Sequence, residues 1–156
     1  MAGVAGMTGE PLRTAPATDD RPPARGAGLV VVAVYVVFAL SATARAGVQL
    51  IRDASEAPLA YGLSAVAALV YVVAAVGLAH NGRRMRRIAT TAVVVELVGV
   101  VVVGAVSLMV PELFPRETVW SHFGSGYGFV PLVLPVVGLF WLWRSSPGRV
   151  ARASER

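Results

Sequence analysis

The sequence predicts an all-α membrane protein, a polytopic bundle of four transmembrane helices with both termini in the cytoplasm. Of its 156 residues, 56% are hydrophobic and 15% are charged, a composition that excludes an ordinary soluble domain. The hydrophobic residues form separate runs near the roughly 20 residues that a helix needs to cross a bilayer core of about 30 Å. The arginines cluster between alternate runs, and this bias predicts the direction of each helix.

The ends of the predicted spans carry local signals. Residues 1–27 are rich in proline and small residues without an apolar period, so we expect a disordered cytoplasmic tail. A proline stands in the first turn of the second span, where a helix tolerates it. Residues 144–156 are expected to form a basic cytoplasmic tail. The four transmembrane helices are expected at 28–50, 58–80, 88–110 and 127–143.

The distribution of arginine predicts the topology. All 14 basic residues are arginines, and eleven of them lie in the two tails and the 80–87 connection. The remaining three are Arg45, Arg52 and Arg116. Because cytoplasmic segments collect positive charge, the tails and the 80–87 connection should be cytoplasmic. Anionic lipid beside these segments explains the net charge of +5 without nucleic-acid binding.

An alternative exists for the first span. Ala42 and Ala44 fit the small-x-small rule for signal-peptide cleavage, so this segment could be a leader cut after Ala44. Such a leader would be long and would carry acidic residues. Its removal would not change the orientation of the later helices.

Glu96 is the only acidic residue deep in any predicted span. A carboxylate in lipid costs several kcal/mol, so the side chain must face protein or water, or be protonated. At 100° per residue its helix face carries small side chains, whereas the opposite face carries valines. The small face comprises Ala89, Ala92, Gly99, Val103 and Ser107, and the valine face Val94, Val98 and Val101.

Two tyrosines fall at a depth similar to that of Glu96. Tyr35 and Tyr71 lie roughly 10 and 13 Å from the cytoplasmic ends of their spans, and Glu96 about 12 Å. We therefore expect an intramembrane polar layer of Glu96, Tyr35 and Tyr71, joined by backbone groups that Pro135 releases. Glu96 would be a structural hydrogen-bond anchor, a proton or substrate site, or a contact for a partner helix.

Arg45 and Gln49 form a second polar group near the outer surface, one helical turn apart. Snorkelling to the headgroups explains them simply. Glu112 and Glu117 on the longest external connection, 111–126, are the alternative partners.

Arg83, Arg84, Arg86 and Arg87 form a cytoplasmic basic cluster. We interpret it as a topology determinant, with binding of anionic lipid or a soluble partner as the alternative. No cofactor or metal is expected, because cysteine is absent and His80 and His122 fall on opposite sides of the membrane.

Three stretches resemble a family of small, uncharacterised actinobacterial integral membrane proteins: residues 46–50 (AGVQL), 56–61 (EAPLAY) and 123–135 (FGSGYGFVPLVLP). The resemblance covers roughly residues 28–143. It implies a four-helix protein of the inner membrane and assigns no catalytic residue.

The residues predict no enzyme, because no nucleophile and base can be assembled from them. We expect a structural or interaction component of the cell envelope. The alternative is a small transporter or proton-coupled carrier that uses Glu96. The expected partners are anionic lipids at the cytoplasmic face, other membrane proteins or further copies of the chain.

Overall fold

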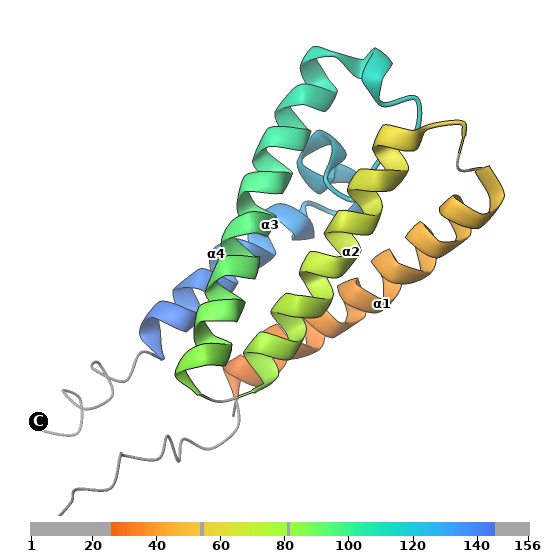
Figure 1. Ribbon diagram of the computed structural model, residues 1–156. Coiled ribbons are helices and arrows are strands. Elements are labelled where there is room, and N and C mark those ends of the chain that lie inside the picture. Colours follow the sequence, from red (N-terminus) through yellow and green to blue (C-terminus); the bar gives the residue numbers. More distant parts are fainter. Residues whose placement is uncertain (1–25, 54, 81, 146–156) are drawn as a thin grey trace, which may run out of the picture.

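The computed structural model describes residues 26–53, 55–80 and 82–145, and every regular element within these ranges is helical (Figure 1). This confirms the all-α class for the described part of the chain. The expectations for the tails concern mainly residues 1–25 and 146–156, which lie outside it. The elements are α1 (Ala27–Asp53), α2 (Pro58–Ala79), α3 (Arg83–Met109), the 3₁₀ segments η1 (Pro111–Leu113) and η2 (Ser121–Tyr127), and α4 (Val130–Arg144).

Three of the helices, α1, α2 and α3, are long and apolar enough to cross a membrane. α4 has only 15 residues, which rise about 22 Å and fall short of a bilayer core of about 30 Å. η2 and α4 together pass as a single span with a bend of 98°. The described chain therefore has three candidate membrane-spanning helices, or four if the bent pair is one span.

The fourth span was predicted from residue 127, and its regular helix starts later because the backbone before α4 is left-handed. His122, Phe123 and Gly124 have φ angles of 52°, 58° and 77°, and Phe129 at the start of α4 has 61°. A left-handed residue other than glycine costs about 1–2 kcal/mol. Contacts with the bundle must hold this turn, and regular helix begins only at Val130.

Two other helices are longer than predicted. α3 begins at Arg83 instead of residue 88, because arginine is a good helix former and the helix continues beyond its apolar run. Gly82, with a φ of 113°, makes the sharp turn from α2. α1 extends to Asp53 instead of residue 50.

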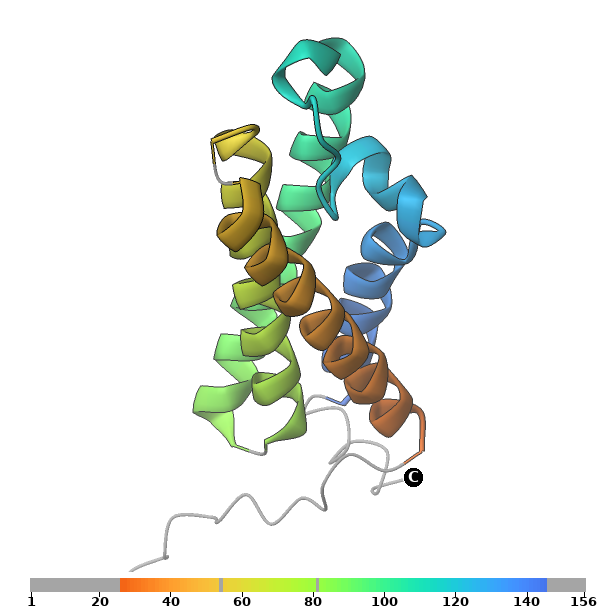
Figure 2. The same ribbon diagram turned by 90° about the vertical axis from the view of Figure 1, so that its right-hand side faces the viewer.

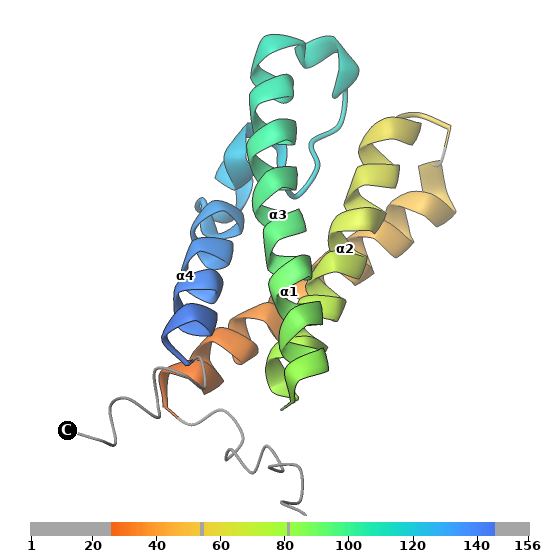
Figure 3. The same cartoon turned by 60° about the vertical axis from the view of Figure 1, so that its left-hand side comes forward.

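The helices pack in chain order, α1 on α2, α2 on α3 and α3 on α4. α1 runs obliquely, so that its start lies beside the end of α4 and its far end beside the start of α2 (Figure 3). Gly77 lets α2 approach α3 closely, since a Cβ there would lie 2.9 Å from the Ala89 backbone nitrogen. We call the end of the bundle that carries Arg83 and Arg87 the basic end, and the opposite end the loop end.

The bundle is built with small residues inside and large aliphatic residues outside. Ala67 and Ala74 in α2 are fully or almost fully buried, whereas Leu69 of the same helix is 64% exposed and Leu40 of α1 is 68% exposed. Small side chains let helix backbones approach, and an aliphatic exterior is suited to lipid.

The connection between α3 and α4 enters the bundle. Figure 2 shows it descending from the loop end toward the middle of the helices. Thr118, Val119, Trp120 and Ser121 are each 1–3% exposed. The sequence predicted an external loop over residues 111–126. Only the first part of this segment, up to Glu117, is largely exposed.

Candidate functional site

Glu96 lies near the middle of α3 and its side chain is completely buried. The Tyr35 hydroxyl of α1 donates a hydrogen bond of 2.7 Å to Glu96 Oε2. Gly138 makes room for this contact in α4, because a Cβ there would lie 3.2 Å from the Tyr35 hydroxyl. One hydrogen bond therefore joins α1 to α3 against the backbone of α4.

The faces of α3 explain how Glu96 reaches this position. Among the residues of its small face, Ala89, Ala92, Val103 and Ser107 are buried and Gly99 is half-buried. On the opposite face Val94, Val98 and Val101 are 42–57% exposed. The small face of α3 thus packs against the other helices and places Glu96 inside the bundle, whereas the valines face the surroundings of the bundle.

Tyr71 of α2 lies in the same layer. Its ring centre is 6.3 Å from that of Tyr35 and 5.7 Å from that of Phe38. Among the described residues, neither its buried hydroxyl nor Glu96 Oε1 has a hydrogen-bond partner. The structure therefore brings Tyr35 to Glu96 directly, and places Tyr71 beside them with unused hydrogen-bonding capacity.

Trp120 is a member of this layer that the sequence analysis missed. Its indole packs on α3 at Gly99, where a Cβ would lie 2.7 Å from a ring carbon, and Gly99 is one turn from Glu96. The indole lies near the Tyr71 hydroxyl, but its N–H meets no hydrogen-bond acceptor in the part of the chain that the structure describes. Polar groups from α1, α2, α3 and the connection that enters the bundle thus meet in one buried region.

A compact turn holds Trp120 in place. The Thr118 hydroxyl accepts hydrogen bonds from the backbone N–H groups of Trp120 (3.1 Å) and Ser121 (3.0 Å). The Ser121 hydroxyl accepts one from the Thr118 N–H at 2.9 Å. Ser107 of α3 then accepts a hydrogen bond from the His122 N–H at 2.8 Å. These bonds satisfy backbone groups that would otherwise be buried unpaired.

Arg45 joins α1 to the connection between α3 and α4 at the loop end of the bundle. Its guanidinium donates hydrogen bonds to the Tyr127 hydroxyl and, at 3.1 Å, to the Glu117 carbonyl oxygen. It also lies 5.8 Å from the centre of the Tyr127 ring, within range of a cation–π interaction. Arg45 thus contacts Glu117, one of its two expected partners, through the backbone carbonyl oxygen. Gln49 does not join this contact, and its buried Oε1 has no hydrogen-bond partner within residues 26–53, 55–80 and 82–145.

The predicted basic cluster divides into two parts. Arg86 donates a hydrogen bond of 3.0 Å to the Ser145 carbonyl oxygen, at the end of α4 where helical carbonyls lack partners. Arg83, Arg84 and Arg87 are exposed. One arginine therefore ties α3 to α4, and three face outward at the basic end.

Within the described residues no group of three or more His, Cys, Asp or Glu side chains is placed to hold a metal ion. His80 and His122 lie at opposite ends of the bundle. The His122 ring is 3.8 Å from a Glu117 carboxylate oxygen, and His80 Nδ1 is 2.8 Å from the Val76 carbonyl oxygen.

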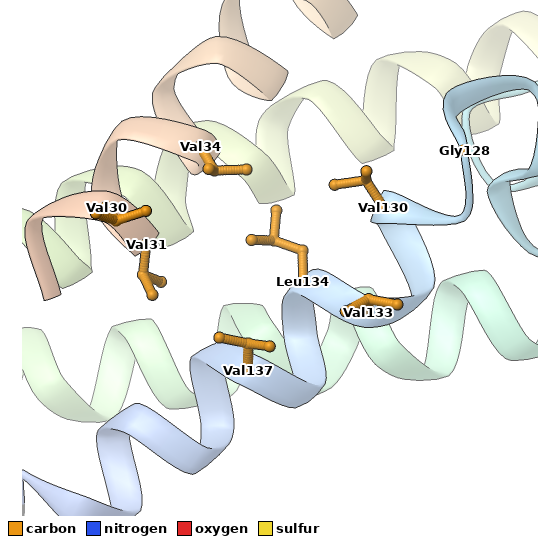
Figure 4. A pocket seen from close by; sticks show the side chains of 8 residues that line it. All are labelled: Val30, Val31, Val34, Gly128, Val130, Val133, Leu134 and Val137. Atoms are coloured by element: carbon orange, nitrogen blue, oxygen red, sulfur yellow. The ribbon is translucent and has the colours of Figure 1, made fainter. Parts of the chain in front are cut away.

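A groove lies between α1 and α4 (Figure 4). Its volume is about 310 Å³, and its lining contains no polar side chain. The lining residues are Val30, Val31, Val34, Gly128, Val130, Val133, Leu134 and Val137.

No protein-family model, curated protein or solved structure matches this sequence.

Proposed function

We propose that this chain is a multi-pass protein of the bacterial plasma membrane, related to the small actinobacterial membrane proteins that it resembles. Its role is that of a structural or interaction component of the cell envelope, without catalytic activity of its own. In this proposal the bent η2–α4 pair is the fourth span, and both termini are cytoplasmic.

The observation that carries this role is that polar side chains join the separate elements of the bundle. Tyr35 bonds Glu96 between α1 and α3, Ser107 bonds the His122 N–H between α3 and η2, and Arg86 bonds Ser145 at the end of α4. Each contact joins elements that are separate in the chain. Polar bonds of this kind hold helices together in lipid, where apolar side chains alone provide little preference for protein over lipid.

The charge distribution supports the orientation. Arg83, Arg84 and Arg144 are exposed at the basic end, where the start of α1 also lies (Figure 3). Both arginine-rich tails leave the described chain at this end. The positive-inside bias makes it the cytoplasmic end.

Single-cysteine labelling tests this orientation, because the native chain contains no cysteine. The positions Ser55, Glu112, Arg84 and Arg144 are exposed. In intact cells a membrane-impermeant maleimide should label Ser55→Cys and Glu112→Cys, but should label Arg84→Cys and Arg144→Cys only after permeabilisation. Labelling of Arg144→Cys in intact cells while Arg84→Cys stays protected would contradict the fourth span.

A second candidate function is a small proton-coupled carrier. Three buried groups have no hydrogen-bond partner among the described residues: Glu96 Oε1, the Tyr71 hydroxyl and the Trp120 N–H. Such atoms usually have a partner in a folded protein, and a transported proton, water or small polar solute would supply one. Glutamate is also a residue that proton relays use within membranes.

Proton flux in vesicles distinguishes the two functions. A carrier should move protons into proteoliposomes, and Glu96→Gln should abolish the movement because glutamine does not titrate. Glu112→Gln, a change of the same kind at an exposed position, is the matched control. Flux equal to that of protein-free vesicles would reject the carrier. A phenotype of gene deletion that Glu96→Gln still complements would support the structural role.

A further inference from the structure

A second groove, between α2 and α3, differs from the α1–α4 groove in its chemistry. Its volume is about 380 Å³, and its walls combine apolar side chains with one cationic and one hydroxyl side chain. The lining residues are Leu69, Val70, Val73, Arg87, Ile88, Thr91, Ala92 and Val95. Leu69 and Val95 are 64% and 44% exposed, so the groove opens sideways from the bundle.

The cation stands at one end of the groove. Arg87 is exposed at the basic end, and Arg83 and Arg84 precede it by four and three residues, so they are its neighbours on the helix surface. Within the described residues, no acidic side chain forms an ion pair with any of these three arginines. Their positive charge is therefore directed to the surroundings of the groove.

The apolar part has the length of one leaflet. From Arg87 to Val95 the helix rises about 12 Å, close to half of a hydrocarbon core of about 30 Å. A ligand that matches this groove has an anionic group at the membrane surface and an alkyl chain extending inward. The α1–α4 groove has similar volume but no charged or polar side chain in its lining, so it offers no anchor for a headgroup.

We propose that the α2–α3 groove binds one anionic phospholipid. Its phosphate contacts Arg87, with Arg83 and Arg84 beside it, and one acyl chain lies along the apolar walls. The inference rests on the proposed membrane embedding. It goes beyond general attraction of lipid to the basic end, because it assigns a stoichiometry of one and a defined groove.

Native mass spectrometry of the full chain in detergent, titrated with phosphatidylglycerol or phosphatidylcholine, tests this site. The parent should retain one phosphatidylglycerol in preference to phosphatidylcholine. Arg87→Gln should weaken phosphatidylglycerol binding about fivefold, equivalent to about 1 kcal/mol for one arginine near an anionic surface. Arg144→Gln, at the same end but on α4, should change binding less than twofold.

The acyl chain is tested by filling the groove. Val94 and Val95 are adjacent and similarly exposed, at 42% and 44%, but only Val95 lines the groove. Val95→Phe should lower the retention of phosphatidylglycerol, and Val94→Phe should leave it unchanged. All four variants alter exposed positions, and circular dichroism verifies their helix content.

Three results would overturn the inference: equal retention of the two lipids, equal loss in the two arginine variants, or equal retention in the two phenylalanine variants. Each would indicate nonspecific lipid around a correctly embedded protein. Recovery of the full chain in the soluble fraction of cells would instead defeat the proposed membrane function itself.

Discussion

Replacing Glu96 by glutamine and by leucine tests whether the acid holds the bundle together. Glutamine keeps an acceptor for the Tyr35 hydroxyl, which now donates to Oε2 at 2.7 Å. Its amide also brings N–H donors toward the Tyr71 hydroxyl, which has no hydrogen-bond partner. Interhelical hydrogen bonds in membranes average about 0.6 kcal/mol. We therefore expect Glu96→Gln to change the free energy of unfolding by less than about 0.5 kcal/mol.

Leucine should behave differently because it removes the acceptor altogether. The Tyr35 hydroxyl, which is completely buried, would then have no partner in the polar layer. Leaving such a group unpaired costs about 1–3 kcal/mol in general, and the upper range of measured membrane hydrogen bonds is near 1.7 kcal/mol. We expect Glu96→Leu to destabilise the bundle by about 1–2 kcal/mol.

The measurement is reversible unfolding in mixed micelles, with Tyr35→Phe and the double variant Tyr35→Phe/Glu96→Leu included. If the hydrogen bond carries the effect, the two single changes should not add, because both remove the same contact. Full additivity, or a Glu96→Leu variant as stable as the parent, would refute the reasoning.

Three further predictions concern other parts of the chain. Gly77→Ala should destabilise the bundle by about 1–3 kcal/mol in the same assay, because the new Cβ meets the Ala89 backbone. Gly62→Ala in the same helix has open space around it and should leave the stability unchanged. Equal effects of the two changes would contradict the close packing of α2 and α3. Trp120→Phe should destabilise by about 1–2 kcal/mol, because the indole is buried against Gly99 and a smaller ring leaves a cavity there; a variant as stable as the parent would contradict this packing. The intact mass should be near 16.3 kDa, and a mass lacking residues 1–44 would establish cleavage after Ala44.

The helical part of the fold was predictable because its signals are local. Apolar runs of bilayer length indicated α1, α2 and α3, and a 100° helical period placed Glu96 on the small face of α3. Depth along each span also placed Tyr35 near Glu96. These deductions need only the rise and period of a regular helix.

The entering connection was not predictable in the same way. Residues 114–126 have no helical period, and their course depends on contacts with α3 that are distant in sequence. Two glycines of α3 gave a partial signal for this course. The ring of Trp120 packs on Gly99, and the ring of Phe123 packs on Gly104. Glycines on a membrane helix indicate close approach, but they do not say which segment approaches. The role of Arg86 at the end of α4 was hidden for the same reason.

The hydrogen bond between Tyr35 and Glu96 has a consequence for how the chain is made. Synthesis proceeds from the N-terminus, so α1 is complete before the ribosome reaches α3. When Glu96 leaves the insertion machinery, its donor has already been produced, whereas Trp120 and α4 have not. The acid can therefore enter lipid with one partner in place, which lowers the penalty of inserting α3. A donor on α4 would be synthesised only after α3, and the nascent α3 would then insert its carboxyl group unaccompanied.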